Sequence, residues 1–424
     1  MKIVVMAGGK GTRIASLRDD IPKPMIPVCG KPVLEHLVDT VKRQGYEELF
    51  FVVGHLGKVI EEHFGDGSEF GVSIRYIREK TPLGTAGALY YLKEQIREDF
   101  LLLNGDIIFD IDIGRMLRYH RQKKAAATIF VHPNDHPYDS GIVEADRKGK
   151  VARWLTKEER RDVYHNRVNA GIHVLSPEIF SLFERAEKKD LDRDVLKRLI
   201  PGGKLFAYSS SEYVKDMGTP QRLAQAQRDI SSGLVAKRNL SQRQTAVFLD
   251  RDGTVNRYKG FIRDAADIEL CAGAAKAIRR INESGYLALI VSNQPVIARG
   301  EADFADVDKM MYKIETLLGE QGAYLDDFYY CPHHPHGGFP GERAELKGPC
   351  TCRKPEPGLL LQAAQEYHID LAASFMIGDS MSDVEAGTRA GCTSYLLKGR
   401  EDYGYDFEDL LQCVNQITGE RTGE

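Results

Sequence analysis

Residues 2–13 read Lys-Ile-Val-Val-Met-Ala-Gly-Gly-Lys-Gly-Thr-Arg, a short β-branched run that passes directly into a glycine-rich loop. An apolar run of this length is typical of a buried strand, and the glycines after it indicate a tight turn. Similar runs at residues 50–53, 73–77, 100–103 and 128–131 alternate with longer amphipathic stretches. This alternation predicts an α/β fold with a doubly wound, mostly parallel sheet.

A second series of the same kind follows, with apolar runs at residues 245–249, 287–291, 374–377 and 393–397. Between the two series, residues 229–244 read DISSGLVAKRNLSQRQ, which is polar and has no strand pattern. A chain of 424 residues is too long for one compact core. We therefore predict two doubly wound α/β domains, at residues 1–230 and 244–424, joined by a linker at 231–243.

The composition is that of a soluble globular enzyme, with 42% hydrophobic and 28% charged residues. A formal net charge of −4 argues against binding nucleic acid by bulk electrostatics. No apolar run approaches the ~20 residues needed to span a bilayer, and the N-terminal run is too short for a secretory signal. Seven cysteines, an odd number, suggest a reduced compartment. We expect a cytoplasmic protein that binds neither nucleic acid nor membrane, and leave a homo-oligomer open.

The glycine loop at residues 8–13 would let backbone N–H groups converge on a phosphate, with charge added by Lys10 and Arg13. It matches neither of the two common phosphate loops. The dinucleotide fingerprint needs a third glycine where Ile14 stands, and the Gly-Lys-Ser/Thr of the P-loop is absent. Taken alone, the loop is equally well explained as a tight strand–helix turn with solvated basic residues.

Four more segments accompany this loop along the first domain. They are PKPM at 22–25, LGTAG at 83–87, NGD at 104–106 and DMGTP at 216–220. Asp106 follows an apolar strand, at the carboxyl edge where open α/β sheets bind ligands, and a carboxylate there is suited to hold Mg²⁺ between triphosphate oxygens. Asp216 offers a second hard oxygen ligand from far along the chain.

This ordered set resembles the sugar-1-phosphate nucleotidyltransferases over about residues 1–230. Within that family it is most similar to the heptose-1-phosphate guanylyltransferases, with mannose-1-phosphate guanylyltransferases second. The resemblance implies attack by a sugar phosphate oxygen on the α-phosphorus of a nucleoside triphosphate. It implies catalytic roles for Arg13 and Lys23, and Mg²⁺ binding by Asp106 and Asp216. The nucleotide-binding residues implied are Ala7, Gly8, Gly9, Lys10, Gly11, Thr12, Gly84 and Thr85.

The sugar phosphate is assigned to Glu144, Lys157 and Asn169, of which Asn169 matches the family's sugar-binding segment. One departure affects this assignment. Many family members carry Glu-Lys-Pro where this chain has Thr156-Lys157-Glu158. A solvated surface lysine is therefore the alternative interpretation of Lys157.

In the second domain, Asp250 and Asp252 directly follow the apolar run at 245–249. Two carboxylates at this spacing leave a strand end together, so that one can attack phosphorus while the other transfers protons. Alone, the pair is equally well explained as metal ligands or a solvated turn. Later residues favour catalysis, because a hydroxyl and a lysine suit a phosphate and further carboxylates suit Mg²⁺; they are Ser292, Lys354, Asp379 and Asp383.

These elements resemble the haloacid dehalogenase-like phosphatases over about residues 243–400. The resemblance implies that Asp250 is the nucleophile and Asp252 the acid and base. Ser292 and Lys354 would then hold the phosphoryl group. The implied Mg²⁺ ligands are Asp250, Asp379 and the backbone carbonyl of Asp252.

Three cysteines and a histidine lie between these motifs and form the ligand set of a closed structural Zn²⁺ site; they are Cys331, His333, Cys350 and Cys352. The intervening loop is rich in Gly and Pro and has few apolar residues to fold around, so a metal would stabilise it. His334 and His336 compete with His333, which the resemblance favours. The alternative is that these cysteines are simply buried or free.

The pattern CPHH at 331–334 and CTCRKPEPG at 350–358 resembles the D-glycero-D-manno-heptose-1,7-bisphosphate 7-phosphatases, with histidinol phosphatases as close relatives. Arg353 is then expected to meet the distal phosphate of the substrate, and Asn293 is also assigned to substrate binding. A departure is Pro295-Val296, where family members usually carry Ser-Gly.

Together the two halves predict a bifunctional enzyme. It would remove the 7-phosphate of a heptose bisphosphate and then transfer a nucleotidyl group, GMP from GTP, to the heptose 1-phosphate. Two alternatives stay open. One is a mannose-1-phosphate guanylyltransferase fused to a histidinol-phosphatase-like or hexose-bisphosphate phosphatase, and the other is a chain in which one domain is catalytically silent and regulatory.

Overall fold

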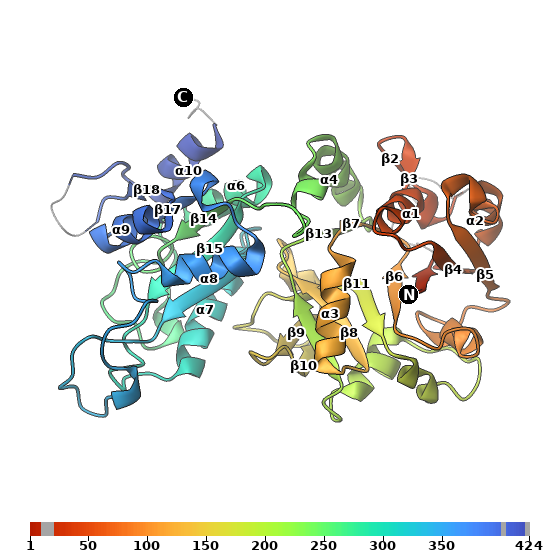
Figure 1. Ribbon diagram of the computed structural model, residues 1–424, viewed down its shortest axis with the longest axis horizontal. Coiled ribbons are helices and arrows are strands. Elements are labelled where there is room, and N and C mark those ends of the chain that lie inside the picture. Colours follow the sequence, from red (N-terminus) through yellow and green to blue (C-terminus); the bar gives the residue numbers. More distant parts are fainter. Residues whose placement is uncertain (10–20, 400–403, 420–424) are drawn as a thin grey trace. The chain divides into compact units, whose positions relative to one another are not determined.

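The computed structural model of the chain describes residues 1–9, 21–399 and 404–419 (Figure 1). The chain divides into two compact units. The first contains Met1–His132, Val143–Leu155 and Asn169–Asn239, and the second contains Pro133–Ile142, Thr156–Val168 and Leu240–Glu424. The final change of unit lies inside the predicted linker at 231–243. The two short segments before residue 169 fall in the second unit, although the predicted boundaries put them in the first domain.

The first unit is built on a nine-stranded mixed sheet and two small two-stranded sheets. Its strands are β1 (Ile3–Met6), β2 (Pro27–Val28), β3 (Lys31–Pro32), β4 (Glu48–Val53), β5 (Ser73–Arg78), β6 (Phe100–Asn104), β7 (Ile107–Asp110), β8 (Ala127–His132), β9 (Ile142–Ala145), β10 (Val151–Leu155), β11 (Val168–Leu175), β12 (Leu205–Ser209) and β13 (Tyr213–Asp216). Its helices are α1 (Val33–Arg43), α2 (Gly57–Phe64), α3 (Ile113–Lys123), α4 (Pro220–Ser231) and α5 (Leu234–Lys237).

Strands β6, β1, β4 and β5 are parallel neighbours, and β11 joins β6 in the antiparallel direction. Each of the five runs predicted in this half is a strand, which confirms the predicted α/β class. Along β1, Ile3 and Val5 face one buried cluster, while Val4 faces another. Because successive side chains of a strand point to opposite faces, both faces of the sheet are covered.

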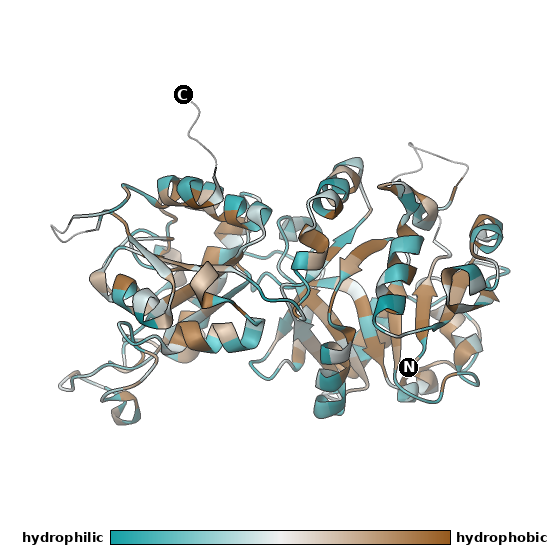
Figure 2. Cartoon of the chain, turned by 45° about the horizontal axis from the view of Figure 1, so that its top comes forward, coloured by the Kyte–Doolittle hydropathy of each residue, from teal (hydrophilic) through white to brown (hydrophobic). Residues whose placement is uncertain are grey.

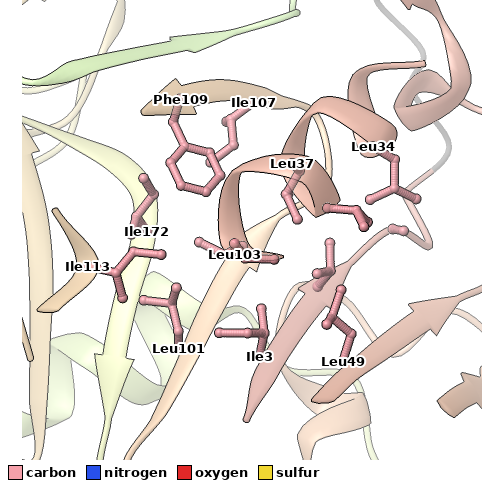
Figure 3. Close-up of a cluster of buried hydrophobic side chains, with 14 of the residues drawn as sticks. Ile3, Leu34, Leu37, Leu49, Leu101, Leu103, Ile107, Phe109, Ile113 and Ile172 are labelled. Carbon is pink, nitrogen blue, oxygen red and sulfur yellow. The ribbon is translucent and has the colours of Figure 1, made fainter. Parts of the chain in front are cut away.

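Helix α1 covers one of these faces. Its apolar residues recur every three or four positions, so Leu34 and Leu37 lie on one side of the helix. They point toward Ile3, Leu49 and the other buried side chains of the sheet (Figure 3). Burying one leucine side chain contributes roughly 1.5–3 kcal/mol, so this cluster is a main source of stability for the strands that position the first site. Hydrophobic residues follow the strands, whereas the surrounding helices carry many hydrophilic ones (Figure 2).

Residues 229–244, which the sequence predicts to be a polar linker, contain helical structure in their first part. Helix α4 continues to Ser231, and Leu234–Lys237 form α5. Thr219 caps the start of α4, and the carboxylate of Asp229 is buried, where it accepts a hydrogen bond of 2.7 Å from the Tyr213 hydroxyl. The polar composition concealed the helix because most of its surface is solvated, while only a few apolar residues and Asp229 face inward; the apolar ones are Leu223, Ala226 and Ile230.

The second unit is built on a five-stranded, fully parallel sheet in the order β16-β15-β14-β17-β18. Its strands are β14 (Ala246–Leu249), β15 (Leu287–Asn293), β16 (Asp327–Cys331), β17 (Phe375–Gly378) and β18 (Thr393–Leu396). Its helices are α6 (Ala274–Ser284), α7 (Phe304–Gly319), α8 (Gly358–Tyr367), α9 (Met381–Ala390) and α10 (Leu410–Thr418). All four runs predicted in this half are strands.

The central strand β14 is buried on both faces. Val247 and Leu249 belong to one core cluster, and Ala246 and Phe248 belong to a second. The doubly wound arrangement predicted for the second half is therefore confirmed. In such sheets ligands bind beyond the carboxyl ends of the strands, which directs attention to the residues after Leu249. Among the helices that the structure describes, none combines the length and the apolar character needed to cross a lipid bilayer.

Candidate active sites

Asp250 stands directly after the central strand β14, where its backbone N–H donates to the carbonyl of Ile377 at 2.9 Å. The ammonium of Lys354 lies 2.5 Å from Asp250 Oδ1, 2.6 Å from Asp383 Oδ1 and 2.8 Å from the carbonyl of Val291. Burial raises the pKa of Asp250 to about 7, and the Lys354 charge opposes this rise. Burial alone would lower the pKa of Lys354, but the Asp250 and Asp383 carboxylates raise it above its ordinary value.

Asp252 is fixed by three donors. Arg251 Nη2 lies 2.7 Å from Asp252 Oδ2, Asn256 Nδ2 lies 3.0 Å from Oδ1, and Gln294 Nε2 lies 3.1 Å from Oδ2. Gln294 also contacts Ser292 Oγ at 2.9 Å and so links the predicted proton donor to the predicted phosphate-binding hydroxyl. The sequence reasoning missed these three donors. Only Gln294 had a signal in the sequence. It stands two residues after Ser292, and side chains two positions apart at a strand end point to the same side.

The amide of Asn293 is engaged with the backbone of Lys354 in both directions. Asn293 Nδ2 donates to the Lys354 carbonyl at 3.1 Å, and the Lys354 N–H donates to Asn293 Oδ1 at 3.0 Å. Asn293 therefore positions Lys354, the predicted catalytic lysine, and its assignment to substrate stays a prediction. Arg353 is half-buried and donates to the carbonyl of His333 at 3.2 Å, which ties the predicted distal-phosphate residue to the loop of the zinc ligands.

Carboxylate oxygens of Asp250, Asp379 and Asp383 lie within 4.8 Å of one another. Gly253 makes this approach feasible, because its φ is +93° and a Cβ there would lie 2.1 Å from Asp379 Oδ2. Three converging hard oxygen ligands, two of them on buried residues, fit a Mg²⁺ ion. The structure thus brings the predicted Asp250 and Asp379 together and adds Asp383 to the set.

The four predicted zinc ligands also converge. Cys352 Sγ lies 3.1 Å from Cys331 Sγ, 3.6 Å from Cys350 Sγ and 3.3 Å from His333 Nδ1. The hydrogen bond with Cys331 lowers the pKa of Cys352 to about 5, so a thiolate is available at neutral pH. Sulfur and imidazole ligands in this number fit Zn²⁺. The competing His334 instead places Nδ1 2.9 Å from the carbonyl of His336.

A pocket of about 250 Å³ opens over the Asp250 site. Besides the residues above, its wall includes Tyr258 and Phe261, which are 39% and 48% exposed. The polar part of the lining includes the predicted nucleophile Asp250, Lys354 and Ser292, while this wall is aromatic. The pocket can therefore hold a phosphate against charged groups and an organic leaving group against rings. Sequence reasoning did not identify this wall.

In the first unit, Lys23 forms an ion pair with Asp106. Strand β13 pairs antiparallel with β7, and the Met217 N–H donates to the Asp106 carbonyl at 2.8 Å. This pairing brings Asp216 to the edge that carries Asp106. The two carboxylates fit a Mg²⁺ ion that also binds phosphate oxygens, and Arg222 pairs with Asp216 at 2.8 Å in the structure.

Ala7, Gly8 and Gly9 lie at the end of β1, whereas the predicted Lys10, Gly11, Thr12 and Arg13 lie outside the described residues. A Cβ at Gly8 would lie 2.7 Å from Glu79 Oε2, and Glu79 Oε1 accepts a hydrogen bond from the Leu83 N–H at 3.1 Å. Burial raises the pKa of Glu79. This carboxylate therefore joins the glycine loop to the LGTAG segment, a role that sequence reasoning missed because Glu79 belongs to neither motif.

Within LGTAG, Gly84 pairs with Lys189 in an isolated bridge, and Thr85 Oγ1 accepts from the Leu191 N–H at 2.7 Å. These contacts hold the predicted nucleotide-binding loop against residues 189–191.

Asn169 lies on β11, where its Nδ2 donates to Asp192 Oδ1 at 3.4 Å. Burial raises the pKa of Asp192 to about 6, and Asp192 is another residue that the motifs did not indicate. Glu144 lies on β9 and pairs with Arg153 at 3.5 Å. Lys157 is exposed and belongs to the second unit. The assignments of Glu144 and Lys157 to the sugar phosphate stay predictions.

Comparison with known proteins matches each half to a family. The nucleotidyl transferase family model matches residues 2–233, and the HAD-hydrolase-like model matches residues 351–402. The chain is 32% identical over 234 residues to a mannose-1-phosphate guanylyltransferase of Mycobacterium tuberculosis, which covers 54% of this chain and 65% of the relative. It is 33% identical to a UTP–glucose-1-phosphate uridylyltransferase of Synechocystis, covering 49% and 57%. The chain thus spans between about half and two thirds of these transferases.

The second half is 38% identical over 152 residues to the D-glycero-beta-D-manno-heptose-1,7-bisphosphate 7-phosphatase of Escherichia coli K12, which covers 36% of this chain and 78% of the relative. Both halves therefore match families of enzymes, one of nucleotidyltransferases and one of phosphatases. The chain belongs to the nucleotidyl transferase family through residues 2–233 and, through its C-terminal half, to the haloacid dehalogenase-like phosphatases.

Proposed function

We propose that this chain is a bifunctional cytoplasmic enzyme that makes a nucleotide-activated heptose. The C-terminal site removes the 7-phosphate of D-glycero-D-manno-heptose 1,7-bisphosphate, and the N-terminal site transfers GMP from GTP to the heptose 1-phosphate with release of pyrophosphate. One observation carries the proposal. The 38% identical relative is named for this bisphosphate, and removal of its 7-phosphate would leave a sugar 1-phosphate, the acceptor class of the transferase in the same chain.

In the phosphatase step, an Asp250 oxygen attacks the phosphorus at C7, the bond from phosphorus to the sugar oxygen breaks, and Asp252 gives that oxygen its proton. Asp252 then takes a proton from water, which attacks the aspartyl phosphate and releases inorganic phosphate. Lys354, 2.5 Å from Asp250, stabilises the negative charge, and Ser292 offers a hydroxyl to a phosphate oxygen. Mg²⁺ bound by Asp250, Asp379, Asp383 and the predicted Asp252 carbonyl would supply further charge neutralisation.

In the transferase step, an oxygen of the sugar phosphate attacks the α-phosphorus of GTP and pyrophosphate leaves. No protein nucleophile is needed, so the work of the site is positioning and charge neutralisation. Lys23, beside Asp106, supplies positive charge, and the glycine loop is expected to bind the triphosphate. Mg²⁺ held by Asp106 and Asp216 would bind phosphate oxygens there.

The choice of GTP is supported by Glu79. Its carboxylate lies next to Gly8 and only accepts hydrogen bonds when ionised. Guanine presents two neighbouring donors, N1–H and the 2-amino group, which one carboxylate can satisfy together, whereas uracil presents a single N–H between two acceptors. The guanylyltransferase relative of Mycobacterium tuberculosis also supports this choice.

Mannose 1-phosphate is a second candidate acceptor, favoured because that same relative is a mannose-1-phosphate guanylyltransferase. It would use the same nucleotide and differ only in the sugar, and the phosphatase would then act on a hexose bisphosphate. A silent regulatory domain has less support, because each unit carries the full set of groups that the proposed chemistry needs. They are Asp250, Asp252 and Lys354 in one unit and Lys23, Asp106 and Asp216 in the other.

A single incubation tests the proposal. The purified chain receives D-glycero-D-manno-heptose 1,7-bisphosphate, Mg²⁺ and all four nucleoside triphosphates, and mass spectrometry identifies every product. A parallel incubation replaces the heptose with mannose 1,6-bisphosphate. We expect GDP-heptose as the only nucleotide sugar and a slower reaction with mannose. Heptose 1-phosphate that accumulates without a nucleotide sugar would contradict the proposed acceptor, and untouched bisphosphate would contradict the proposed phosphatase substrate.

A further inference from the structure

The guanidinium of Arg299 lies between two phenyl rings in the second unit. Its Cζ is 4.3 Å from the ring centroid of Phe261 and 4.4 Å from that of Phe339. The Arg299 side chain is only 17% exposed, and it forms an ion pair with Glu301, with Arg299 Nη2 2.6 Å from Glu301 Oε1. With its charge paired and two phenyl rings against it, Arg299 is suited to hold other residues in place rather than to bind a substrate anion itself.

The two rings belong to loops with different tasks. Phe261 lines the pocket over Asp250, whereas Phe339 lies in the loop between His333 and Cys350. Ala298, the residue before Arg299, forms backbone hydrogen bonds to that second loop and its start through both its N–H and its carbonyl. The Ala298 N–H donates to the Pro332 carbonyl at 3.2 Å, and the Arg343 N–H donates to the Ala298 carbonyl at 3.0 Å.

Further contacts fix both rings. Glu301, which pairs with Arg299, also accepts from Arg263 Nε at 2.9 Å, and Arg263 lies two residues after Phe261. On the other side, the Phe339 N–H donates to Glu342 at 3.0 Å. Phe261 is 48% exposed, so it has little packing of its own to hold it against the pocket. The contact with Arg299, together with the pairing of Glu301 to Arg263 two residues further on, therefore sets its position.

We propose that Arg299 is a positioning residue that clamps Phe261 to Phe339 and so fixes the aromatic wall of the phosphatase pocket against the sugar of the substrate. Since Phe339 belongs to the loop that carries the metal ligands, this clamp also couples the metal loop to the substrate wall. The inference rests on the proposed phosphatase function. It assigns Phe261 to recognition of the sugar and gives the loop of Cys331, His333, Cys350 and Cys352 a part in specificity as well as stability.

Arg299→Met tests the clamp, because it keeps the side-chain length and removes the planar charge. We expect KM for the heptose bisphosphate to rise about tenfold while kcat changes less than about threefold, the pattern of lost substrate positioning. Inhibition by inorganic phosphate, which has no sugar, should stay within about twofold of wild type. Arg299→Lys should recover only part of the loss, because an ammonium does not stack between two rings.

Lys347→Met is the matched control, because Lys347 also lies over Phe339, 4.7 Å from its centroid, but is not among the residues that line the pocket and does not join Phe339 to Phe261. We expect its KM to stay near that of wild type. In a Phe261→Leu background, Arg299→Met should add little further change in KM, because the clamped ring is already gone. Should Arg299→Met fail to fold, Phe261→Leu and Phe339→Leu test the same contact from either side, and each should raise KM.

A second readout does not use activity. Zinc-loaded protein is mixed with a chromogenic chelator, and Arg299→Met should release the metal several-fold faster than wild type and Lys347→Met. An equal loss of kcat/KM and of phosphate binding, or an unchanged KM for Arg299→Met, would overturn the clamp. If wild type leaves the heptose bisphosphate untouched but hydrolyses another sugar phosphate, the proposed substrate fails, and the same comparison with that sugar phosphate still tests the clamp.

Discussion

Glu79 is the residue at which the choice of nucleotide can be tested directly. Its two carboxylate oxygens lie between the glycine loop and Leu83. Glu79→Gln replaces one acceptor with a donor, which would face a donor of guanine. We expect kcat/KM for GTP to fall about 10–100-fold while that for UTP stays equal or rises. Competition between GTP and UTP, read by mass spectrometry, measures this ratio.

The control for this variant is Glu69→Gln, an exposed carboxylate on the surface of the same unit. It should leave the ratio of GTP to UTP unchanged. A Glu79→Gln enzyme with the wild-type preference for GTP would show that another group reads the base.

His173 on β11 gives the first unit a dependence on pH. The side chain is buried, and burial lowers its pKa from 6.5 to about 4. The folded chain therefore keeps the imidazole neutral at a pH where the unfolded chain binds a proton. Stability should fall as pH falls from about 6.5 to about 4, by at most about 3 kcal/mol. Urea unfolding at pH 7 and pH 5 measures the loss, with the single tryptophan, Trp154 on β10, as a fluorescent reporter of this unit.

His173→Leu removes this titration and keeps an apolar side chain in the core. The difference between its pH profile and that of wild type isolates the histidine, since buried His120 also has a lowered pKa and is present in both. We expect the variant to lose less stability than wild type between pH 7 and pH 5. Parallel profiles would show that His173 is protonated as easily in the folded chain as in the unfolded one.

The residues that we propose to carry the chemistry have a clear signal in the sequence, whereas those that support them have little or none. Asp250, Asp252 and Lys354 stand in short motifs whose spacing limits their roles. Glu79 acts by reaching the glycine loop across the fold, so its role depends on a tertiary contact that no local pattern encodes. The spacing of Gln294 from Ser292 indicates the side on which Gln294 lies, but not its contact with Asp252. Asn293 is a related case. The sequence assigned its side chain to substrate, but in the structure its amide is hydrogen-bonded to the backbone of Lys354, a contact that local sequence does not indicate.

The metal loop is an element whose order should depend on its ligands. Cys350→Ser removes one of the four and leaves a site too weak to hold Zn²⁺. We expect the metal content to fall from about one to near zero per chain, and the unfolding midpoint of the second unit to drop by about 5–15 °C. Nucleotidyl transfer on supplied heptose 1-phosphate should continue. Elemental analysis and calorimetry measure the two effects.

Cys271→Ser provides the comparison, since Cys271 is a partly buried cysteine of the same unit outside the ligand cluster. It should keep its zinc. Full stability and full activity in Cys350→Ser, with the metal gone, would exclude a structural role for the ion.

Among the elements, the strands were easier to predict than the way in which they pair with one another. Runs such as 246–249 are apolar throughout because both faces of the sheet are covered, which makes them recognisable in the sequence. The pairing of β13 with β7 has no such signal, because it depends on the path of all the chain between them. That pairing brings Asp216 to Asp106, so only the resemblance to a family predicted their joint role.

For the whole molecule, the question is whether the two activities can be separated. Asp250→Asn removes the proposed nucleophile of the second unit, and Asp106→Asn removes a predicted metal ligand of the first. In the first variant, the rate of phosphate release should fall at least about 10³-fold below that of wild type. This variant should still transfer GMP to supplied heptose 1-phosphate. The second should do the reverse. Phosphate release and nucleotide-sugar formation are measured on each protein.

Mixing the two variants then tests how the intermediate travels. Each mixture contains one working copy of each site, but never in one chain. If heptose 1-phosphate diffuses freely, the mixture should first accumulate this intermediate during a lag. It should then make GDP-heptose at close to the wild-type rate, when both are compared at equal concentrations of working sites. The lag should shorten as total protein rises, because transfer between chains depends on concentration. If wild type makes nucleotide sugar without a lag while the mixture accumulates heptose 1-phosphate, the intermediate passes within one chain. If either single variant loses both activities, the two sites are not independent.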